Sequence, residues 1–120
     1  MARGRYVVGP VADLPPGSIT IVPVGKFGVG VFNVKGQFYA LTNYCPHRGA
    51  PLCRGRITGV AEAGSAPYEV RWAREGEVLR CPWHGWEFEI ASGTACLFPE
   101  KGIKTYPVTV EDEMVVLEGV

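Results

Sequence analysis

Histidine and cysteine are scarce in this 120-residue sequence, which contains two histidines and four cysteines. The 12 basic and 12 acidic side chains cancel to a formal net charge of zero, which argues against nucleic acid or an anionic membrane as a partner. No apolar run approaches the roughly 18–20 residues needed to cross a bilayer, and residues 1–10 lack the apolar stretch of a signal peptide. We therefore expect a cytoplasmic protein whose cysteines are metal ligands or free thiols rather than disulfides.

Turn-forming residues are plentiful, with 16 glycines and 10 prolines, and they favour short strands joined by tight turns. No segment sustains the 3.6-residue period of a helix. Lys35-Gly36 lies between two apolar runs and predicts a two-residue hairpin. The expected strands cover residues 6–8, 18–24, 27–34, 37–41, 86–90, 94–98, 104–110 and 114–117. The length predicts one domain over residues 1–120, and the pattern predicts an antiparallel all-β barrel or sandwich.

Both histidines lie beside cysteines, in two irregular stretches between the expected strands. The first stretch contains Cys45 and His47 with one residue between them, and the second contains Cys81 and His84 with two between them. Thiolate and imidazole are donors that bind zinc or the iron of iron–sulfur clusters. Spacing alone leaves both metals open, because a structural zinc site can also use two cysteines and two histidines.

The residues around these donors resemble the two cluster-binding boxes of Rieske proteins. The matching residues are Cys45, His47 and Gly49 in the first box, and Cys81, Pro82, His84 and Gly85 in the second. The resemblance implies a 2Fe–2S cluster in which Cys45 and Cys81 hold one iron while His47 and His84 hold the other. It also implies a Rieske-like β barrel or sandwich with a small cluster-binding subdomain formed by two loops, and no catalytic residues.

Residues near the boxes refine the resemblance. Rieske proteins of cytochrome bc complexes carry an extra disulfide, and this sequence has Ala50 and Trp83 at those positions. The same proteins place serine and tyrosine hydroxyls near the cluster sulfurs, where this sequence has Trp86 and Phe88. Fewer hydrogen bonds to sulfur lower the potential, so we expect roughly −150 to −50 mV. The pattern is closer to ferredoxins of aromatic-ring-hydroxylating systems and to small subunits of nitrite reductase.

The stretch between the boxes is about twice as long as in that group, and the excess falls at about residues 58–77. Alternation over residues 68–72 predicts a strand, and Glu75-Gly76 is expected to turn it back onto residues 78–80. The result would be an added hairpin beside the cluster. It is either a tolerated surface insertion or a docking element that uses Arg71, Trp72 and Arg74.

Several further residues have two interpretations. Cys53 and Cys96 lie outside the boxes and are expected to be free thiols, with a Cys53–Cys96 disulfide as the alternative. Trp83 and Trp86 are interpreted as shields for the cluster rather than as an electron path. Pro99 is assigned to the loop that covers the cluster in Rieske folds.

The function expected from this resemblance is one-electron transfer from a flavin reductase to a terminal oxygenase or similar enzyme. The alternative is a relay subunit held permanently by a large reductase subunit, as in NADH-dependent nitrite reductase, and a structural zinc-binding interaction module is a remote third. The chain is not expected to be an enzyme alone, because both histidines are used and none is left for the mononuclear iron of an oxygenase. An excess of arginine around the boxes suggests an acidic partner face.

Overall fold

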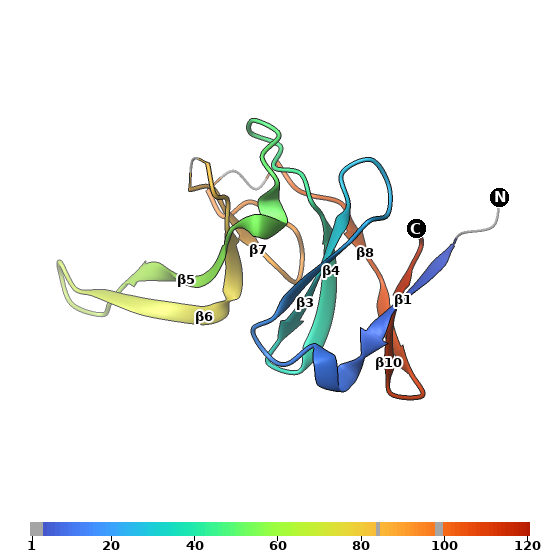
Figure 1. Ribbon diagram of the computed structural model, residues 1–120. Helices are drawn as coiled ribbons and strands as arrows, with labels where there is room; N and C mark the ends of the chain where they lie inside the picture. The colour runs from blue at the N-terminus through green and yellow to red at the C-terminus, as the bar shows by residue number, and fades with distance from the viewer. Residues whose placement is uncertain (1–3, 84, 98–99) are drawn as a thin grey trace.

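The chain folds almost entirely into β structure, in a computed structural model that describes residues 4–83, 85–97 and 100–120 (Figure 1). The strands are β1 (Arg5–Pro10), β2 (Ile19–Val22), β3 (Val29–Val34), β4 (Gln37–Thr42), β5 (Arg56–Ala63), β6 (Val70–Arg80), β7 (Glu87–Glu89), β8 (Thr105–Tyr106), β9 (Val108–Glu111) and β10 (Met114–Glu118). Two single-turn 3-10 helices, η1 (Val11–Asp13) and η2 (Leu52–Arg54), interrupt them. In the described ranges, neither helix has the length or the apolar content to cross a bilayer.

Three antiparallel sheets make up the molecule. The strand orders are β1-β10-β9, β2-β3-β4-β8 and β5-β6-β7. Figure 1 shows the β1–β10–β9 sheet, which contains the strands nearest both chain ends, on the right and the β5–β6–β7 sheet on the left. The β2–β3–β4–β8 sheet lies between them. The expected antiparallel all-β architecture is confirmed.

The central sheet is buried on both faces, because successive residues of a strand point to opposite sides. Val29 and Val31 of β3 pack in one core with residues of β10, such as Leu117. Phe32 of β3 and Leu41 of β4 pack in the other core, together with the β6–β7 region. The second core holds the segments that contain the cysteines, so the central sheet is the platform on which those segments rest.

Two hairpins have the tight turns that local sequence predicts. Lys35 and Gly36 join β3 to β4 with φ values of 52° and 91°. Asp112 and Glu113 join β9 to β10 with φ values of 50° and 63°. Positive φ at both central residues is the type I′ geometry that matches the twist of the paired strands.

Glu113→Gly is expected to stabilise the protein, because glutamate is unfavourable at positive φ and glycine is not. The greater freedom of glycine in the unfolded chain offsets part of the gain, which leaves about 0.5–1 kcal/mol. Thermal unfolding should show a melting temperature raised by about 2–4 °C. Glu113→Ala is the matched control, since it removes the same carboxylate but keeps the unfavourable φ. An equal gain in both variants would contradict this account.

Two of the expected strands are shorter than predicted. Residues 94–98 were expected to be a strand, but in the described part Thr94 and Ala95 make only isolated bridges, to Gly102 and Phe88. Residues 104–110 form two strands, β8 and β9, separated by Pro107. Proline has no N–H to give to a ladder, which explains the interruption.

The excess residues between the two boxes form a long hairpin arm, defined here as β5, β6 and the turn between them. Figure 1 shows the arm extending to the left, away from the rest of the molecule. An added hairpin was predicted, but the predicted turn at Glu75-Gly76 is wrong. The chain turns at residues 64–69, where the Gly64 N–H donates to the Glu69 carbonyl at 2.8 Å.

At the residues where the turn was expected, β6 continues and bulges instead. Arg74 and Gly76 have φ values of 56° and 86°, and the pairing with β5 shifts between Thr58 and Val60. A bulge inserts extra residues into one strand and bends it without ending the pairing. Positive φ at residues 74–76 therefore marks a bend in the arm and not its tip.

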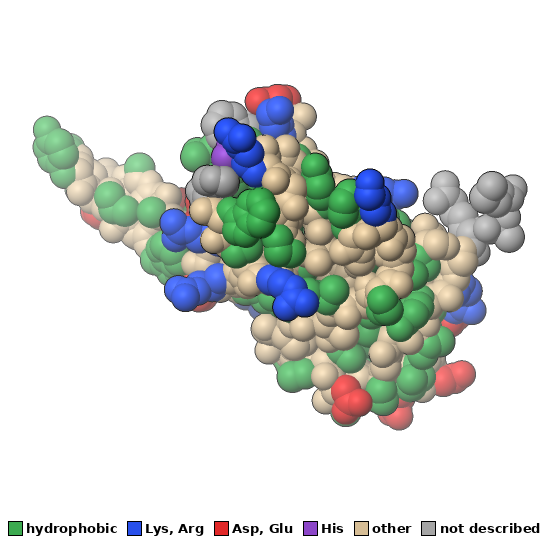
Figure 2. All heavy atoms as spheres, turned by 45° about the horizontal axis from the view of Figure 1, so that its top comes forward, with side chains coloured by type: hydrophobic (Ala, Val, Ile, Leu, Met, Phe, Trp, Pro, Cys, Tyr) green, Lys and Arg blue, Asp and Glu red, His purple; other side chains and the backbone are tan. Residues whose placement is uncertain are grey.

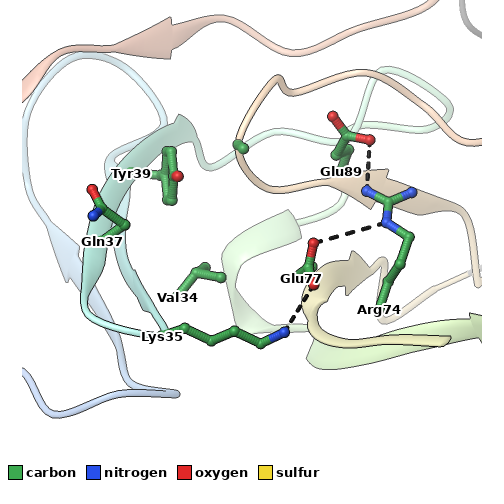
Figure 3. Close-up of a pocket in the computed structure, with 8 residues that line it drawn as sticks. Val34, Lys35, Gln37, Tyr39, Arg74, Glu77 and Glu89 are labelled. Carbon is green, nitrogen blue, oxygen red and sulfur yellow. Dashed lines mark hydrogen bonds and ion pairs between the residues drawn. The ribbon is translucent and has the colours of Figure 1, made fainter.

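Ion pairs join the base of the arm to the central sheet and to β7 (Figure 3). The Lys35 Nζ lies 2.9 Å from Glu77 Oε2, which connects the β3–β4 turn to β6. The Arg74 Nη2 lies 2.6 Å from Glu89 Oε2, which connects the bulge to β7. A hydrogen bond from Ser92, and then the Arg74 guanidinium, hold the pKa of the Glu89 carboxyl below its ordinary value. These contacts orient the base of the arm, although exposed pairs contribute little stability.

Candidate metal centre

The first cysteine-bearing loop follows β4 and is closed by its own backbone. The Cys45 N–H donates to the Ala50 carbonyl at 2.9 Å, and the Gly49 N–H donates back to the Cys45 carbonyl at 2.7 Å. Gly49 has a φ of 76°, a conformation that glycine adopts without steric cost. The two hydrogen bonds hold Cys45 at the start of a compact loop.

The second loop follows β6 and repeats the same pattern. The Cys81 N–H donates to the Trp86 carbonyl at 2.7 Å, and the Gly85 N–H donates to the Cys81 carbonyl at 3.2 Å. Gly85 has a φ of 73°. The spacing of donors and acceptors equals that of the first loop, so the two loops are local repeats of one backbone design. The glycine in each sequence box closes its loop.

The two cysteines at the starts of these loops meet in the core. Cys45 and Cys81 are both buried in the same core, and the Cys81 side chain is near enough to affect the Cys45 thiol. Burial is the main cause that raises the pKa of the Cys45 thiol above its ordinary value, and the neighbouring Cys81 adds to this, while the backbone N–H of His47 opposes it. Two sulfur donors that converge in an apolar pocket suit a metal centre, because binding would convert the thiols to thiolates and replace their protons.

The structure places one of the two predicted histidines. His47 lies on the first loop and stacks on Trp86 of the second, with ring centroids 4.5 Å apart and an interplanar angle of 11°. His84 and Pro99 fall outside the described residues. Across residues 4–83, 85–97 and 100–120, no three side chains of the metal-binding types gather at one point. The described structure therefore brings Cys45 and Cys81 together, and ligation by His47 and His84 stays a prediction.

Hydrophobic side chains surround the two sulfurs. Phe88 is fully buried in the same core as Cys45 and Cys81. Trp86 is half-buried and stacks against the His47 ring, in the position expected of a shield. Trp83 is 57% exposed, and its role as a shield stays a prediction.

The remaining two cysteines are free thiols, as predicted. Cys53 is buried on η2, and desolvation raises the pKa of its thiol to about 12. Cys96 is half-buried, and burial followed by the nearby Glu87 carboxylate raises its pKa above the ordinary value. Neither thiol ionises readily at neutral pH, which suits packing rather than chemistry.

The sequence analysis missed how β3 approaches η2. A side chain at Gly30 would overlap the Cys53 sulfur and would lie 2.8 Å from its Cβ atom. Glycine in the interior of an apolar strand often marks such an approach. Gly30 in an apolar strand therefore indicated a close approach, but the sequence did not show that η2 is the segment that approaches.

Comparison with known proteins connects this site to a family. The Rieske [2Fe-2S] domain family matches residues 4–107. The ferredoxin component of naphthalene 1,2-dioxygenase/salicylate 5-hydroxylase systems from Ralstonia sp is 31% identical over 107 residues, which cover 88% of this chain and 86% of that protein. The fold resembles the ferredoxin of Sphingomonas yanoikuyae B1, with a TM-score of 0.70, 32% identity and coverage of 96% and 98% of the two chains. It also resembles a chain in the complex of reduced oxygenase and oxidized ferredoxin of carbazole 1,9a-dioxygenase, with a TM-score of 0.74, 27% identity and coverage of 96% and 93%.

Two buried thiols on paired loops of an antiparallel β scaffold suit a metal centre, and the family match identifies that centre as an iron–sulfur cluster. The chain belongs to the Rieske [2Fe-2S] domain family. Its cofactor is a Rieske 2Fe–2S cluster, which supplies reversible one-electron chemistry when bound. The protein is an electron carrier of the ferredoxin type. The family match excludes the remote alternative, a structural zinc module.

Phe88→Tyr is expected to raise the reduction potential, because it places a hydroxyl in the core that contains Cys45 and Cys81. A hydrogen bond to a charged acceptor contributes about 1.5 kcal/mol, and this corresponds to roughly 60 mV for one electron. Voltammetry of the loaded protein measures the shift. Phe38→Tyr is the matched control, since Phe38 packs against the core on the other side of the central sheet. Equal shifts in the two variants would contradict the assignment.

Proposed function

We propose that this protein passes single electrons from a flavin reductase to a terminal oxygenase. The observation that carries the proposal is reciprocal coverage. The Ralstonia ferredoxin component matches 88% of this chain over 86% of its own length. The two proteins therefore align along most of both chains. A ferredoxin component of a dioxygenase system is the function that this similarity supports.

We further propose that Cys45 and Cys81 hold one iron of the cluster and that His47 and His84 hold the other. The burial of both cysteines in one core supports the cysteine part. The position of His47 on the same closed loop as Cys45 supports the histidine part, because one loop then presents a sulfur and a nitrogen donor together. Removing either histidine should leave a protein that no longer gives the Rieske spectrum.

The proposed domain organisation is a single Rieske domain over residues 1–120, with the excess near residues 58–77 carried by the arm. The outer part of the β5–β6 hairpin extends beyond Val78–Arg80, the part of β6 that pairs with β7, which supports its assignment as an insertion. Its proposed docking trio is reduced to Arg71 and Trp72, since Arg74 is bound to Glu89 within the chain.

The protein is proposed to have no catalytic activity of its own. A Rieske oxygenase needs a second iron held by two histidines and a carboxylate, and the only two histidines of this chain are assigned to the cluster. We also propose a cytoplasmic location, because the free thiols Cys53 and Cys96 are typical of a reducing compartment.

Anaerobic capture of the tagged, cluster-loaded protein from its own cells tests carrier against permanent subunit. A carrier must dissociate, so we expect substoichiometric reductase and oxygenase that are lost as salt is raised. The captured reductase should then reduce the protein by one electron per chain, measured by the change in visible absorption. A stable one-to-one partner that carries sirohaem or flavin would overturn the carrier assignment in favour of a relay subunit.

A further inference from the structure

A groove beside the second cysteine loop is lined by basic side chains. It encloses about 720 Å³, and its lining includes Arg54, Arg56, Arg80 and Trp83 together with Cys81. The three arginines are exposed. Figure 2 shows basic side chains gathered around the histidine and toward the base of the arm, while several acidic side chains lie at the lower edge of the molecule. We call this feature the arginine groove.

Two of these arginines face each other across paired strands. Arg56 of β5 and Arg80 of β6 are direct partners in the antiparallel register. Side chains of direct partners lie on the same face of a sheet, and like charges in that arrangement are destabilising. The pair is therefore a feature that folding alone does not favour.

The neighbouring strand offers incomplete compensation for this repulsion. Glu87 of β7 is the direct partner of Arg80 on its other side. Even so, among the described residues no carboxylate lies within ion-pair distance of Arg54, Arg56 or Arg80. Two facing guanidinium groups therefore retain unused donors that suit the planar oxygens of a carboxylate.

The groove is also close to the loop that contains the second cysteine. The Nε and Nη2 atoms of Arg80 lie 3.2 Å from the point where a Cβ atom on Gly85 would be, so this guanidinium packs on the loop. Trp83, at 57% exposure, adds an aromatic surface to the groove. Arginine and tryptophan are the residue types most enriched at energetically dominant positions of protein interfaces.

We infer that the arginine groove binds carboxylates of an acidic surface segment on the redox partner. The inference rests on the proposed electron-carrier function and specifies the chemistry of the partner. A carboxylate between Arg56 and Arg80 would relieve their repulsion. It would also hold the partner against the Cys81 loop, at the metal centre. The charge pair is retained at a cost to stability because it serves docking, as is common where binding and folding compete.

Binding of a fluorescently labelled hexaglutamate peptide to the cluster-loaded protein tests the inference by fluorescence anisotropy. At about 0.01 M salt, where charges act over roughly 30 Å, Arg56→Gln and Arg80→Gln should each weaken binding at least about fivefold. Arg5→Gln is the matched control, because it removes one positive charge in β1, where Arg5 pairs with Glu118. It should change binding less than about twofold, as expected for screened surface charge. Equal weakening in all three variants, or no peptide binding by the wild type, would overturn the inference.

Thermal unfolding of the same variants provides a second, independent measurement. Arg56→Gln should raise the melting temperature of the loaded protein, because it removes the cross-strand repulsion, while it weakens peptide binding. A purely structural role for Arg56 predicts the opposite sign, with a lowered melting temperature. A lowered or unchanged melting temperature would therefore overturn the claim that the pair is retained for binding.

Reductive titration separates failure of this inference from failure of the proposed function. Wild type and variants should each accept one electron per chain, followed by visible absorption. If the wild type accepts no electron, the electron-carrier function is wrong, whether or not the protein binds hexaglutamate. If it accepts one electron and the arginine variants bind peptide as the wild type does, only the arginine groove assignment fails.

Discussion

Replacing Cys45 with serine is expected to abolish incorporation of the cluster. Cys45 is buried in the same core as Cys81, so the serine oxygen, a harder donor on a shorter bond, replaces the lost sulfur poorly in that pocket. Loss of a ligand should exceed the 10–100-fold drop in metal affinity that accompanies loss of residues around a ligand. Iron analysis should fall from two irons per chain to nearly none, and the visible absorption should disappear. Cys81→Ser is expected to behave in the same way.

The matched controls are the other two cysteines. Cys53→Ser and Cys96→Ser should keep full iron content, because neither thiol lies in a cysteine loop. Far-ultraviolet circular dichroism establishes whether each variant retains β structure. If Cys53→Ser lost iron as completely as Cys45→Ser while keeping its β structure, the assignment of the metal centre would be wrong.

Gly30→Ala is expected to produce a large loss of stability. The added methyl group would overlap the Cys53 sulfur and approach Phe32 Cε1 to 3.2 Å. Overpacking of a core costs about 1–3 kcal/mol, and a melting temperature lowered by roughly 4–12 °C should follow. Gly30 and Cys53 lie where β3 contacts η2. The substitution therefore acts directly on the sheet that supports the metal centre.

A double-mutant cycle distinguishes this clash from a general intolerance of β3 to alanine. Cys53→Gly removes the two Cys53 atoms that the new methyl group would overlap. Gly30→Ala combined with Cys53→Gly should therefore be more stable than the sum of the two single effects, by about 2 kcal/mol. Chemical denaturation of the four proteins measures the coupling. Additive effects would mean that the cost of Gly30→Ala has another origin.

Local sequence was sufficient for the features that depend on neighbouring residues. The Lys35-Gly36 turn was predictable because backbone freedom at two positions decides a type I′ hairpin. The two cysteine–histidine boxes were recognised by their resemblance to those of Rieske proteins. Each lies in a loop that closes on itself within six residues, Cys45 to Ala50 in the first and Cys81 to Trp86 in the second. The all-β class followed from the abundance of turn residues and the absence of a helical period.

Tertiary structure decided the features that join distant segments. The meeting of Cys45 with Cys81 depends on both loops packing into one core, a contact that no local pattern encodes. The arm was misread at Glu75-Gly76 because a glycine at positive φ serves a turn and a bulge equally well, and only pairing with β5 separates the two. The juxtaposition of Arg56 with Arg80 follows from that same strand register. Side-chain chemistry and local backbone freedom are properties of the sequence, whereas register and burial arise when strands far apart in the chain pair and exclude water.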